Sequence, residues 1–240
     1  MEKNGQNLSP RNEYKYFVPI TKYAHLLKDI KLFAVADDNA TNKDGFYTVS
    51  SIYFENLQLR SYFDKLDGLA RRYKLRLRFY SMENKDEINF ELKCKIFNKC
   101  IKKKTKFKSQ LLPMILEENC LEEIKDPILL DFINVKKANG LFPFIRIDYK
   151  RKPFFDKNDS NTRITFDYDV NCCRYEEDID KLPWIPVVPH GNIILEIKTR
   201  ECFPFWLPYL VKKYSLKKIP ISKYLLAVQN VSLNSSLSIK

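Results

Sequence analysis

Segments that alternate charged and apolar residues recur along this chain, and residues 73–80, YKLRLRFY, show the pattern most clearly. Successive side chains of an extended chain point to opposite faces. Side chains on one face are therefore Tyr73, Leu75, Leu77 and Phe79, and those on the other include Lys74, Arg76 and Arg78. A solvated strand usually mixes charges of both signs, whereas this face carries three cations and no anion. The segment is predicted to be a β-strand with one apolar and one basic face.

Similar alternation, with many β-branched and aromatic residues, predicts eight strands in all. They are expected at residues 11–18, 46–55, 71–80, 88–97, 100–107, 143–152, 162–169 and 192–200. Helices are expected at residues 21–32, 108–118, 121–137 and from 203 onward, with a short helix or turn at 56–67.

Charged residues share one face of nearly every predicted strand. For a single strand, a solvated surface is the ordinary explanation of this pattern. The charged faces comprise Arg11, Glu13 and Lys15; Glu91, Lys93 and Lys95; Lys102, Lys104 and Lys106; Arg163, Thr165 and Asp167; and Glu196 and Lys198. Repetition over so many strands favours a closed barrel with the charge inside and helices outside.

We therefore predict an α+β fold, an eight-stranded antiparallel β-barrel with helices packed outside. No linker or repeat divides the chain. One domain is expected at residues 11–228, between a flexible N-terminus at 1–10 and a C-terminal tail at 229–240.

The net charge of +12 favours an anionic partner, such as nucleic acid, an anionic membrane or a polyanionic small molecule. A lysine-rich composition that only keeps the protein soluble is the alternative. No known nucleic-acid motif occurs, and the cations lie opposite apolar strand faces, so nucleic acid is not expected. Cations gathered in a lumen repel one another unless anions or water lie between them. This favours a polyphosphate-like ligand.

The other composition signals point to a cytoplasmic protein. Six cysteines without a C-x-x-C pair, and two histidines, argue against a structural zinc site. The polar start MEKNGQNLSP does not resemble a signal peptide. Residues 203–211, FPFWLPYLV, are too short to span a bilayer, and two prolines interrupt them. They are expected to pack as a helix, with peripheral contact to a membrane left open.

A carboxylate among cations can hold the divalent metal that phosphoryl transfer needs. Glu196 is the strongest candidate, and Glu13, Glu91 and Asp167 are weaker ones. An ion pair with Lys198 or an arginine is the alternative role for Glu196.

Eight short motifs occur in a characteristic order. They are RNEYKYF at 11–17, SSIYFE at 50–55, KLRLRFY at 74–80, FELK at 90–93, YKRKPF at 149–154, RITFD at 163–167, LEIK at 195–198 and ISKY at 221–224. Together they resemble the VTC domain, the polyphosphate polymerase domain of the vacuolar transporter chaperone complex. That domain is one of the triphosphate tunnel metalloenzymes, and the resemblance covers about residues 11–226.

The resemblance implies an eight-stranded antiparallel tunnel that binds a triphosphate. It implies transfer of the γ-phosphoryl group of ATP to a growing polyphosphate chain, with Mn²⁺ or Mg²⁺. By motif, Glu196 matches the metal ligand. The residues implied to contact phosphates are Lys15, Arg76, Arg78, Lys93, Arg151 and Arg163 as catalytic residues, with Lys104, Lys106, Lys198 and Lys223 as further phosphate-binding residues.

Two features depart from the simplest pattern. Arg11 stands where the broader superfamily often has a glutamate, which disfavours a two-carboxylate metal site on the first strand. In the sixth strand, Arg151 shares a face with the apolar Ile145 and Ile147, while Arg146 lies opposite. Either a bulge shifts the phase of this strand, or Arg146 also points inward.

Three functions remain open at the level of sequence. The first is the polymerase, whose partners would be ATP and polyphosphate, with a membrane-protein partner also conceivable. The second is a tunnel triphosphatase or tripolyphosphatase that uses nearly the same residues. The third is a module that binds polyphosphate without chemistry.

Overall fold

The computed structural model describes residues 12–38, 40, 44–80, 86–97, 99–117, 124–176, 183–200 and 203–237, without the side chains of 99, 100 and 233–237. The expected flexible N-terminus at 1–10 and the departure at Arg11 lie outside the described residues.

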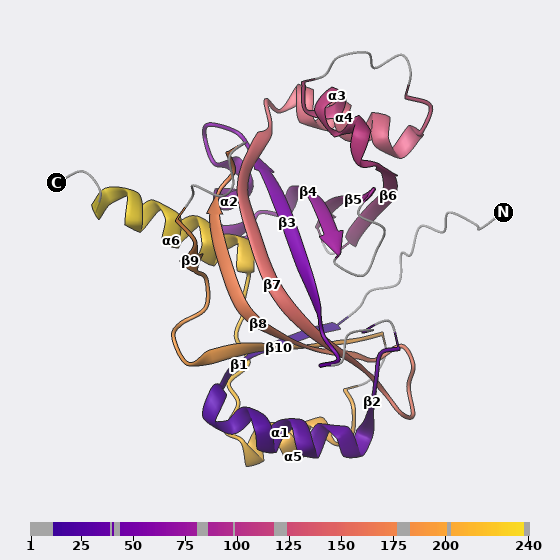
Figure 1. The fold of residues 1–240 in the computed structure, drawn as a ribbon, viewed down its shortest axis with the longest axis vertical. Coiled ribbons are helices and arrows are strands. Elements are labelled where there is room, and N and C mark those ends of the chain that lie inside the picture. Colours follow the sequence, from indigo (N-terminus) through magenta and orange to yellow (C-terminus); the bar gives the residue numbers. More distant parts are fainter. Residues whose placement is uncertain are drawn as a thin grey trace.

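Long strands form a single antiparallel sheet in the order β1-β10-β8-β7-β3-β4-β5-β6 (Figure 1). Their bounds are β1 Asn12–Pro19, β3 Tyr47–Glu55, β4 Arg71–Tyr80, β5 Glu87–Ile96, β6 Lys99–Lys108, β7 Phe142–Asp156, β8 Arg163–Arg174 and β10 Asn192–Thr199. All eight predicted strands are present, which confirms the α+β class and the antiparallel sheet. Two short strands were not predicted: β2, Ala34–Ala36, pairs with β7, and β9, Ile185–Pro186, pairs with β8.

The sheet is curled but its hydrogen-bonded ladder is not closed, in contrast to the predicted barrel. Within the described residues, β1 and β6 are the two ends of the ladder. The free edge of β1 pairs with the segment that follows residue 213. Tyr16 forms an isolated antiparallel β-bridge with Lys218, and the Ile219 N–H donates to the Lys15 carbonyl at 2.9 Å. The edge is thus already satisfied without β6.

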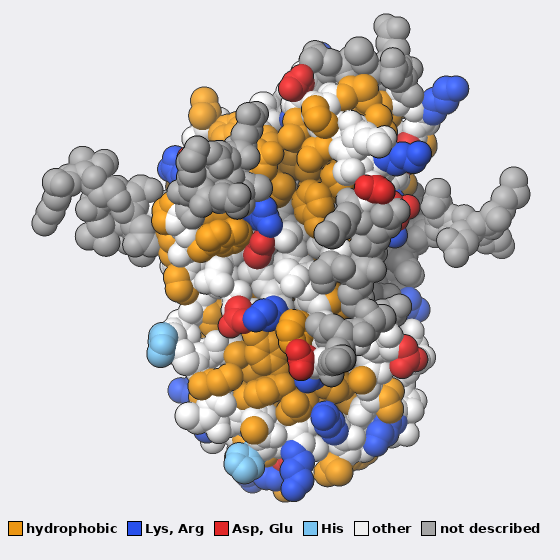
Figure 2. Space-filling model, viewed as in Figure 1, with side chains coloured by type: hydrophobic (Ala, Val, Ile, Leu, Met, Phe, Trp, Pro, Cys, Tyr) orange, Lys and Arg blue, Asp and Glu red, His pale blue; other side chains and the backbone are white. Residues whose placement is uncertain are grey.

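Helices cover two regions of the convex face. The helices α1, Ile20–Phe33, and α5, Leu207–Lys213, lie together at one end of the molecule (Figure 1). They bury an apolar cluster that includes Leu26, Leu195 and Leu210. At the other end, the 3-10 helix Ser109–Leu111, α3, Leu112–Glu117, and α4, Pro127–Ala138, form a cluster that includes Leu77, Phe90 and Phe132. Figure 2 shows apolar side chains gathered toward both ends, with acidic and basic side chains adjoining near the middle.

The last helix, α6, Lys223–Leu237, is an exception to the prediction that helices pack only outside. Tyr224, Ala227 and Val228 are buried against Ile147 and Ile194, which share the concave face with the charged residues. Val231 belongs to the same cluster, so the expected domain boundary at residue 228 falls inside a packed helix. The short helix α2, Arg60–Leu66, lies beside the first turns of α6.

The position of α6 explains the face of the sixth predicted strand, β7. Its register with β3 is continuous from Ile145 to Arg151, so the apolar and basic residues of this stretch share the concave face. Arg146 lies on the opposite face, where its Nε donates a hydrogen bond to Asp148 Oδ1 at 2.9 Å. Neither predicted alternative holds. The register shift near this point adds a residue to β8 and not to β7, beside Asp169, which has a φ of 48°.

No helix of the described residues is long and apolar enough to cross a membrane.

Candidate functional site

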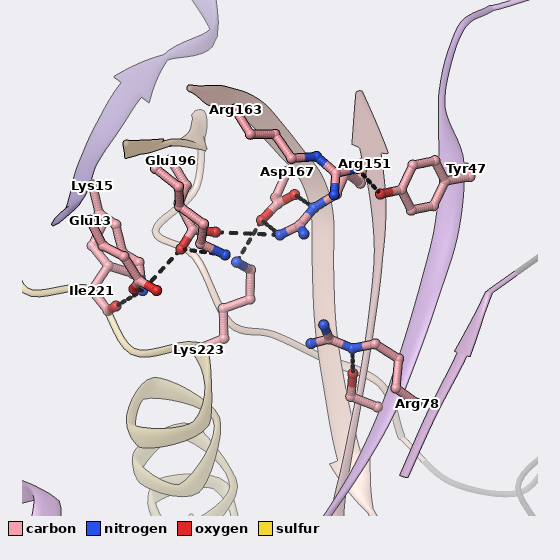
Figure 3. A network of polar contacts seen from close by, with 12 residues as sticks. Glu13, Lys15, Tyr47, Arg78, Arg151, Arg163, Asp167, Glu196, Ile221 and Lys223 are labelled. Atoms are coloured by element: carbon pink, nitrogen blue, oxygen red, sulfur yellow. Dashed lines mark hydrogen bonds and ion pairs between the residues drawn. The ribbon is translucent and has the colours of Figure 1, made fainter. Parts of the chain in front are cut away.

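Glu196 of β10 lies at the centre of a buried charge network on the concave face (Figure 3). Its Oε1 is 3.3 Å from Lys15 Nζ and 3.4 Å from Lys198 Nζ, and its Oε2 accepts a hydrogen bond from Arg151 Nη2 at 3.5 Å. Burial raises the pKa of Glu196, but the surrounding cations outweigh this and hold the pKa well below its usual range. Glu196 is therefore ionised throughout the neutral range. The ion-pair role that the sequence left open is present.

Arg151 of β7 connects this network to Asp167 of β8. Its Nε and Nη2 donate to the two carboxylate oxygens of Asp167 at 2.7 and 2.8 Å. Lys223, in the first turn of α6, places Nζ 2.6 Å from the same carboxylate. The structure thus brings Lys15, Arg151, Lys198, Lys223 and Glu196 together, although they come from four elements.

Arg163 lies at the edge of this group. Its Nη2 donates to Asp37 at 2.9 Å and to the Tyr47 hydroxyl at 3.1 Å. Its Nε is buried, and no acceptor lies within hydrogen-bond distance among the described residues. Thr165 Oγ1, on the strand position opposite Glu196, is likewise buried and unpartnered there. Such groups are costly unless a ligand or water satisfies them.

A second cluster lies on β4, β5 and β6. Arg76 donates two hydrogen bonds to Glu91, one of them from Nε at 2.7 Å. Lys102 Nζ lies 3.3 Å from the other oxygen of Glu91. Arg78 donates from Nε to Ser51 Oγ at 3.1 Å and points toward Arg151 and Lys223 (Figure 3). The two clusters therefore face each other across the concave side of the sheet.

Lysines of three strands form a row beside this second cluster. Lys74, Lys93 and Lys102 are direct cross-strand neighbours on β4, β5 and β6. Like charges in directly opposed positions repel. Burial lowers the pKa of Lys74 to about 8 and that of Lys102 to about 8, with neighbouring cations adding to the effect.

The remaining predicted lysines lie nearer the sheet edge. Lys104 is exposed and opposite Glu91, and Lys106 Nζ is 3.1 Å from Glu87. Lys103, which lies between Lys102 and Lys104 and points to the other face of β6, pairs with Asp131 of α4 on the convex side. The alternation in β6 therefore separates concave from convex lysines as predicted.

The pKa of Glu13 reflects charges on several strands of the sheet. Burial raises the pKa of Glu13, but Lys198, Lys15 and Lys93 together lower it below the ordinary value. Glu13 is on β1, at one end of the ladder, and Lys93 is on β5, next to the strand at the other end, so charges on widely separated strands of the ladder act on one another.

Sequence reasoning missed the polar partners on β3. Tyr47, Ser51 and Tyr53 share the concave face and contact Arg163, Arg78 and Arg76 respectively. Their common parity in the FYTVSSIYFE segment is visible in the sequence, but these residues also suit any β-strand. The loop residue Asp37, which pairs with Arg163, carried no signal of this kind.

The residues fit a divalent metal only in part. The described residues contain no group of three or more His, Cys, Asp or Glu side chains placed to hold a metal. Magnesium is commonly held by one or two carboxylates together with phosphate oxygens and water. Glu196 would be the carboxylate that this network offers to such a metal.

Several solved structures have a similar fold. One is a presumed adenylate cyclase from Bacillus halodurans, with a TM-score of 0.56 and 12% identity over 91% of this chain and 95% of that chain. A protein from Pyrococcus horikoshii has a TM-score of 0.46 and 13% identity over 92% and 99% of the two chains. A presumed adenylate cyclase from Vibrio parahaemolyticus has a TM-score of 0.49 and 12% identity over 92% and 98%. At such identities, the Bacillus structure supports the fold alone.

No curated protein sequence matches the chain. Residues 10–232 match the sequence model of the VTC domain. The match includes every motif on which the resemblance was based, from RNEYKYF to ISKY. This chain belongs to the VTC domain family.

Proposed function

We propose that this protein is a polyphosphate polymerase that transfers the γ-phosphoryl group of ATP onto a growing polyphosphate chain. The proposal rests on one observation: Glu196, surrounded by Lys15, Lys198 and Arg151, faces the cluster that contains Arg76 and Arg78. A chain of phosphates between the two clusters would meet cations on both sides. Family membership supports the same class of ligand.

The arrangement suits phosphoryl transfer, in which the protein mainly positions groups and neutralises charge. Arg76 and Arg78 would hold terminal phosphates on one wall. Arg151 and Arg163 would hold them on the other, and the unpartnered Nε of Arg163 is a donor ready for a phosphate oxygen. The lysines act as less directional charges, with Lys93 and Lys102 extending the basic surface.

Glu196 is the residue proposed to hold Mn²⁺ or Mg²⁺. A metal bound there would neutralise charge on bridging phosphate oxygens. Lys15 and Lys198 orient the carboxylate from two sides. A histidine or cysteine nucleophile has no part in this scheme.

We also propose that the protein works in the cytoplasm at the periphery of a membrane, with a membrane-protein partner. The support comes from α5 and the residues just before it. Phe205 is 73% and Tyr209 is 64% exposed, while Trp206 and Leu210 are buried. Lys213 lies over the Tyr209 ring. Aromatic side chains beside lysines are typical of interfacial segments.

Incubation of purified protein with ATP and Mn²⁺ or Mg²⁺, followed by gel analysis, tests the proposed activity. A ladder of long polyphosphate is expected, and Glu196→Gln should abolish it. Asp131→Asn, which removes a carboxylate paired with a lysine on the convex side, is the matched control and should retain the ladder.

Other outcomes would replace the proposal. Release of inorganic phosphate from ATP or tripolyphosphate, without polymer, would assign a tunnel triphosphatase. Binding of tripolyphosphate without turnover under either metal would assign a binding module.

A further inference from the structure

The hydroxyl of Tyr53 has an unusual set of neighbours. Tyr53 lies on β3 directly opposite Arg76, with only 9% of its surface exposed. Its hydroxyl oxygen accepts a hydrogen bond from Arg76 Nη1 at 3.0 Å. Among the described residues, no carboxylate or carbonyl accepts the phenolic proton in return. A buried hydroxyl that only accepts, and accepts from a cation, favours loss of its own proton.

Cations dominate the charges around this hydroxyl. On β4, Lys74, Arg76 and Arg78 act on it. From β5, Glu91 accepts hydrogen bonds from Nε and Nη2 of the same Arg76 guanidinium. From α6, the Tyr224 ring lies 5.2 Å from the Tyr53 ring. Burial raises the pKa of Tyr53, but the three cations outweigh burial and lower the pKa to about 7.

Two other tyrosines of the concave face differ in their surroundings. Tyr224 donates its hydroxyl proton to the buried carboxylate of Glu55. Tyr47 accepts from Arg163 at 3.1 Å, but burial is the largest influence and raises its pKa. Tyr53 is the member of this group whose ionised form is substantially populated near neutral pH. The phenolate would neutralise part of the charge on Arg76 in the absence of ligand.

We propose that Tyr53 is a positioning residue of the phosphate site. In the free protein, the phenolate of Tyr53 holds the guanidinium of Arg76. When phosphate oxygens bind Arg76 and Arg78, Tyr53 takes up a proton. This inference rests on the proposed phosphate site. The proton comes from solvent and forms the phenolic O–H bond, and no other bond changes. Negative charge from the ligand replaces negative charge from Tyr53, so the cations remain balanced.

The expected pH dependence follows from this exchange. A bound anion raises the pKa of Tyr53, so ligand binding takes up a proton at pH values above about 7. The affinity for the phosphate ligand should therefore weaken as pH rises through and above about 7. Lys74 and Lys102, with pKa values of about 8, would also take up protons on anion binding. The contribution of Tyr53 must be isolated by comparison with a variant.

Isothermal titration with inorganic tripolyphosphate, in two buffers of different ionisation enthalpy, measures the protons taken up. Over pH about 6 to 9, Tyr53→Phe should take up fewer protons than wild type, by up to about one per ligand. Tyr47→Phe is the matched control, since it also removes a hydroxyl that accepts from an arginine. It should keep the wild-type proton uptake. Protonation of the ligand itself is common to all three proteins and cancels.

A second measurement uses wild type alone, in case Tyr53→Phe does not fold. The ultraviolet absorption of tyrosinate should be present near pH 8 and should fall on saturation with tripolyphosphate. Equal proton uptake in wild type and Tyr53→Phe, or absorption that does not change on binding, would overturn the inference while leaving the proposed function intact. Failure of tripolyphosphate to bind wild type would overturn the proposed function, and this inference with it.

Discussion

Arg151 and Asp167 form a bidentate pair inside the curled sheet, with both carboxylate oxygens accepting at 2.7 and 2.8 Å. Two parallel hydrogen bonds fix the plane of the guanidinium. Asp167 is fully buried and is also paired with Lys223. A phosphate that reaches Arg151 therefore meets an arginine already oriented by the protein. The carboxylate also sets how much positive charge is left for the ligand.

Asp167→Asn should destabilise the protein and increase the stabilisation that a bound polyanion gives to it. Removal of the buried counterion of Arg151 and Lys223 is expected to lower the free energy of unfolding by about 3 kcal/mol. The two uncompensated cations should bind tripolyphosphate more tightly, which stabilises the folded state. Urea unfolding with and without tripolyphosphate measures both effects. A ligand-induced stabilisation no larger than that of wild type would contradict the expectation.

Lys102→Ala and Lys103→Ala offer a matched test of the concave face. The two lysines are adjacent on β6, but Lys102 contacts Glu91 and Lys103 pairs with Asp131 on the convex side. Loss of Lys102 should weaken polyphosphate binding by about 1 kcal/mol, or about five-fold, at low salt. Lys103→Ala should change affinity little. Titrations at two salt concentrations check this, since the loss should shrink as salt rises. Equal losses in both variants would count against a concave binding surface.

Glu91 should contribute to stability in a pH-dependent way. Burial raises its pKa, but Arg76, Arg78 and Lys102 outweigh burial and hold the pKa far below its ordinary value of 4.5. A depressed pKa stabilises the folded state above the unfolded pKa, and this stability is lost as pH falls below about 4.5 toward the folded pKa. Glu91→Gln should cost about 3 kcal/mol at neutral pH.

The measurement for Glu91 is urea unfolding at a series of pH values. Wild type and Glu91→Gln should differ most near neutral pH and converge in strong acid. Glu87→Gln, on the same strand but more exposed, should differ little from wild type throughout. A constant difference between wild type and Glu91→Gln at every pH would show that the pairing with Arg76 is not responsible.

Glu196→Gln separates metal binding from phosphate binding. The variant should lose the increase in tripolyphosphate affinity that Mn²⁺ gives to wild type, because the proposed ligand is gone. Metal-free binding should persist, because Lys15, Lys198 and Arg151 lose a competing anion. Calorimetry with and without Mn²⁺ distinguishes the two effects. A variant that retains the full Mn²⁺ effect would move the metal to another carboxylate.

The alternation of residues was sufficient to assign faces in the predicted strands other than β7. Lys74, Arg76 and Arg78 lie on the concave side, and Leu75 and Leu77 pack under the convex helices. The partners of those cations were not predictable. Glu91 is one of several carboxylates with suitable parity, and only the register of β4 with β5 places it opposite Arg76. Register depends on contacts along the whole sheet, which local periodicity does not contain.

The sequence by itself determined the eight long strands and the face of most of their charged residues, because a period of two is imposed by backbone geometry. The tertiary structure alone decided that α6 packs on the concave face, beside residues such as Ile147, whose apolar side chain had left the phase of its strand open. It also decided that Arg151 and Lys223 share Asp167, and that Tyr53 holds Arg76. These contacts join segments far apart in the chain, and burial sets their strength.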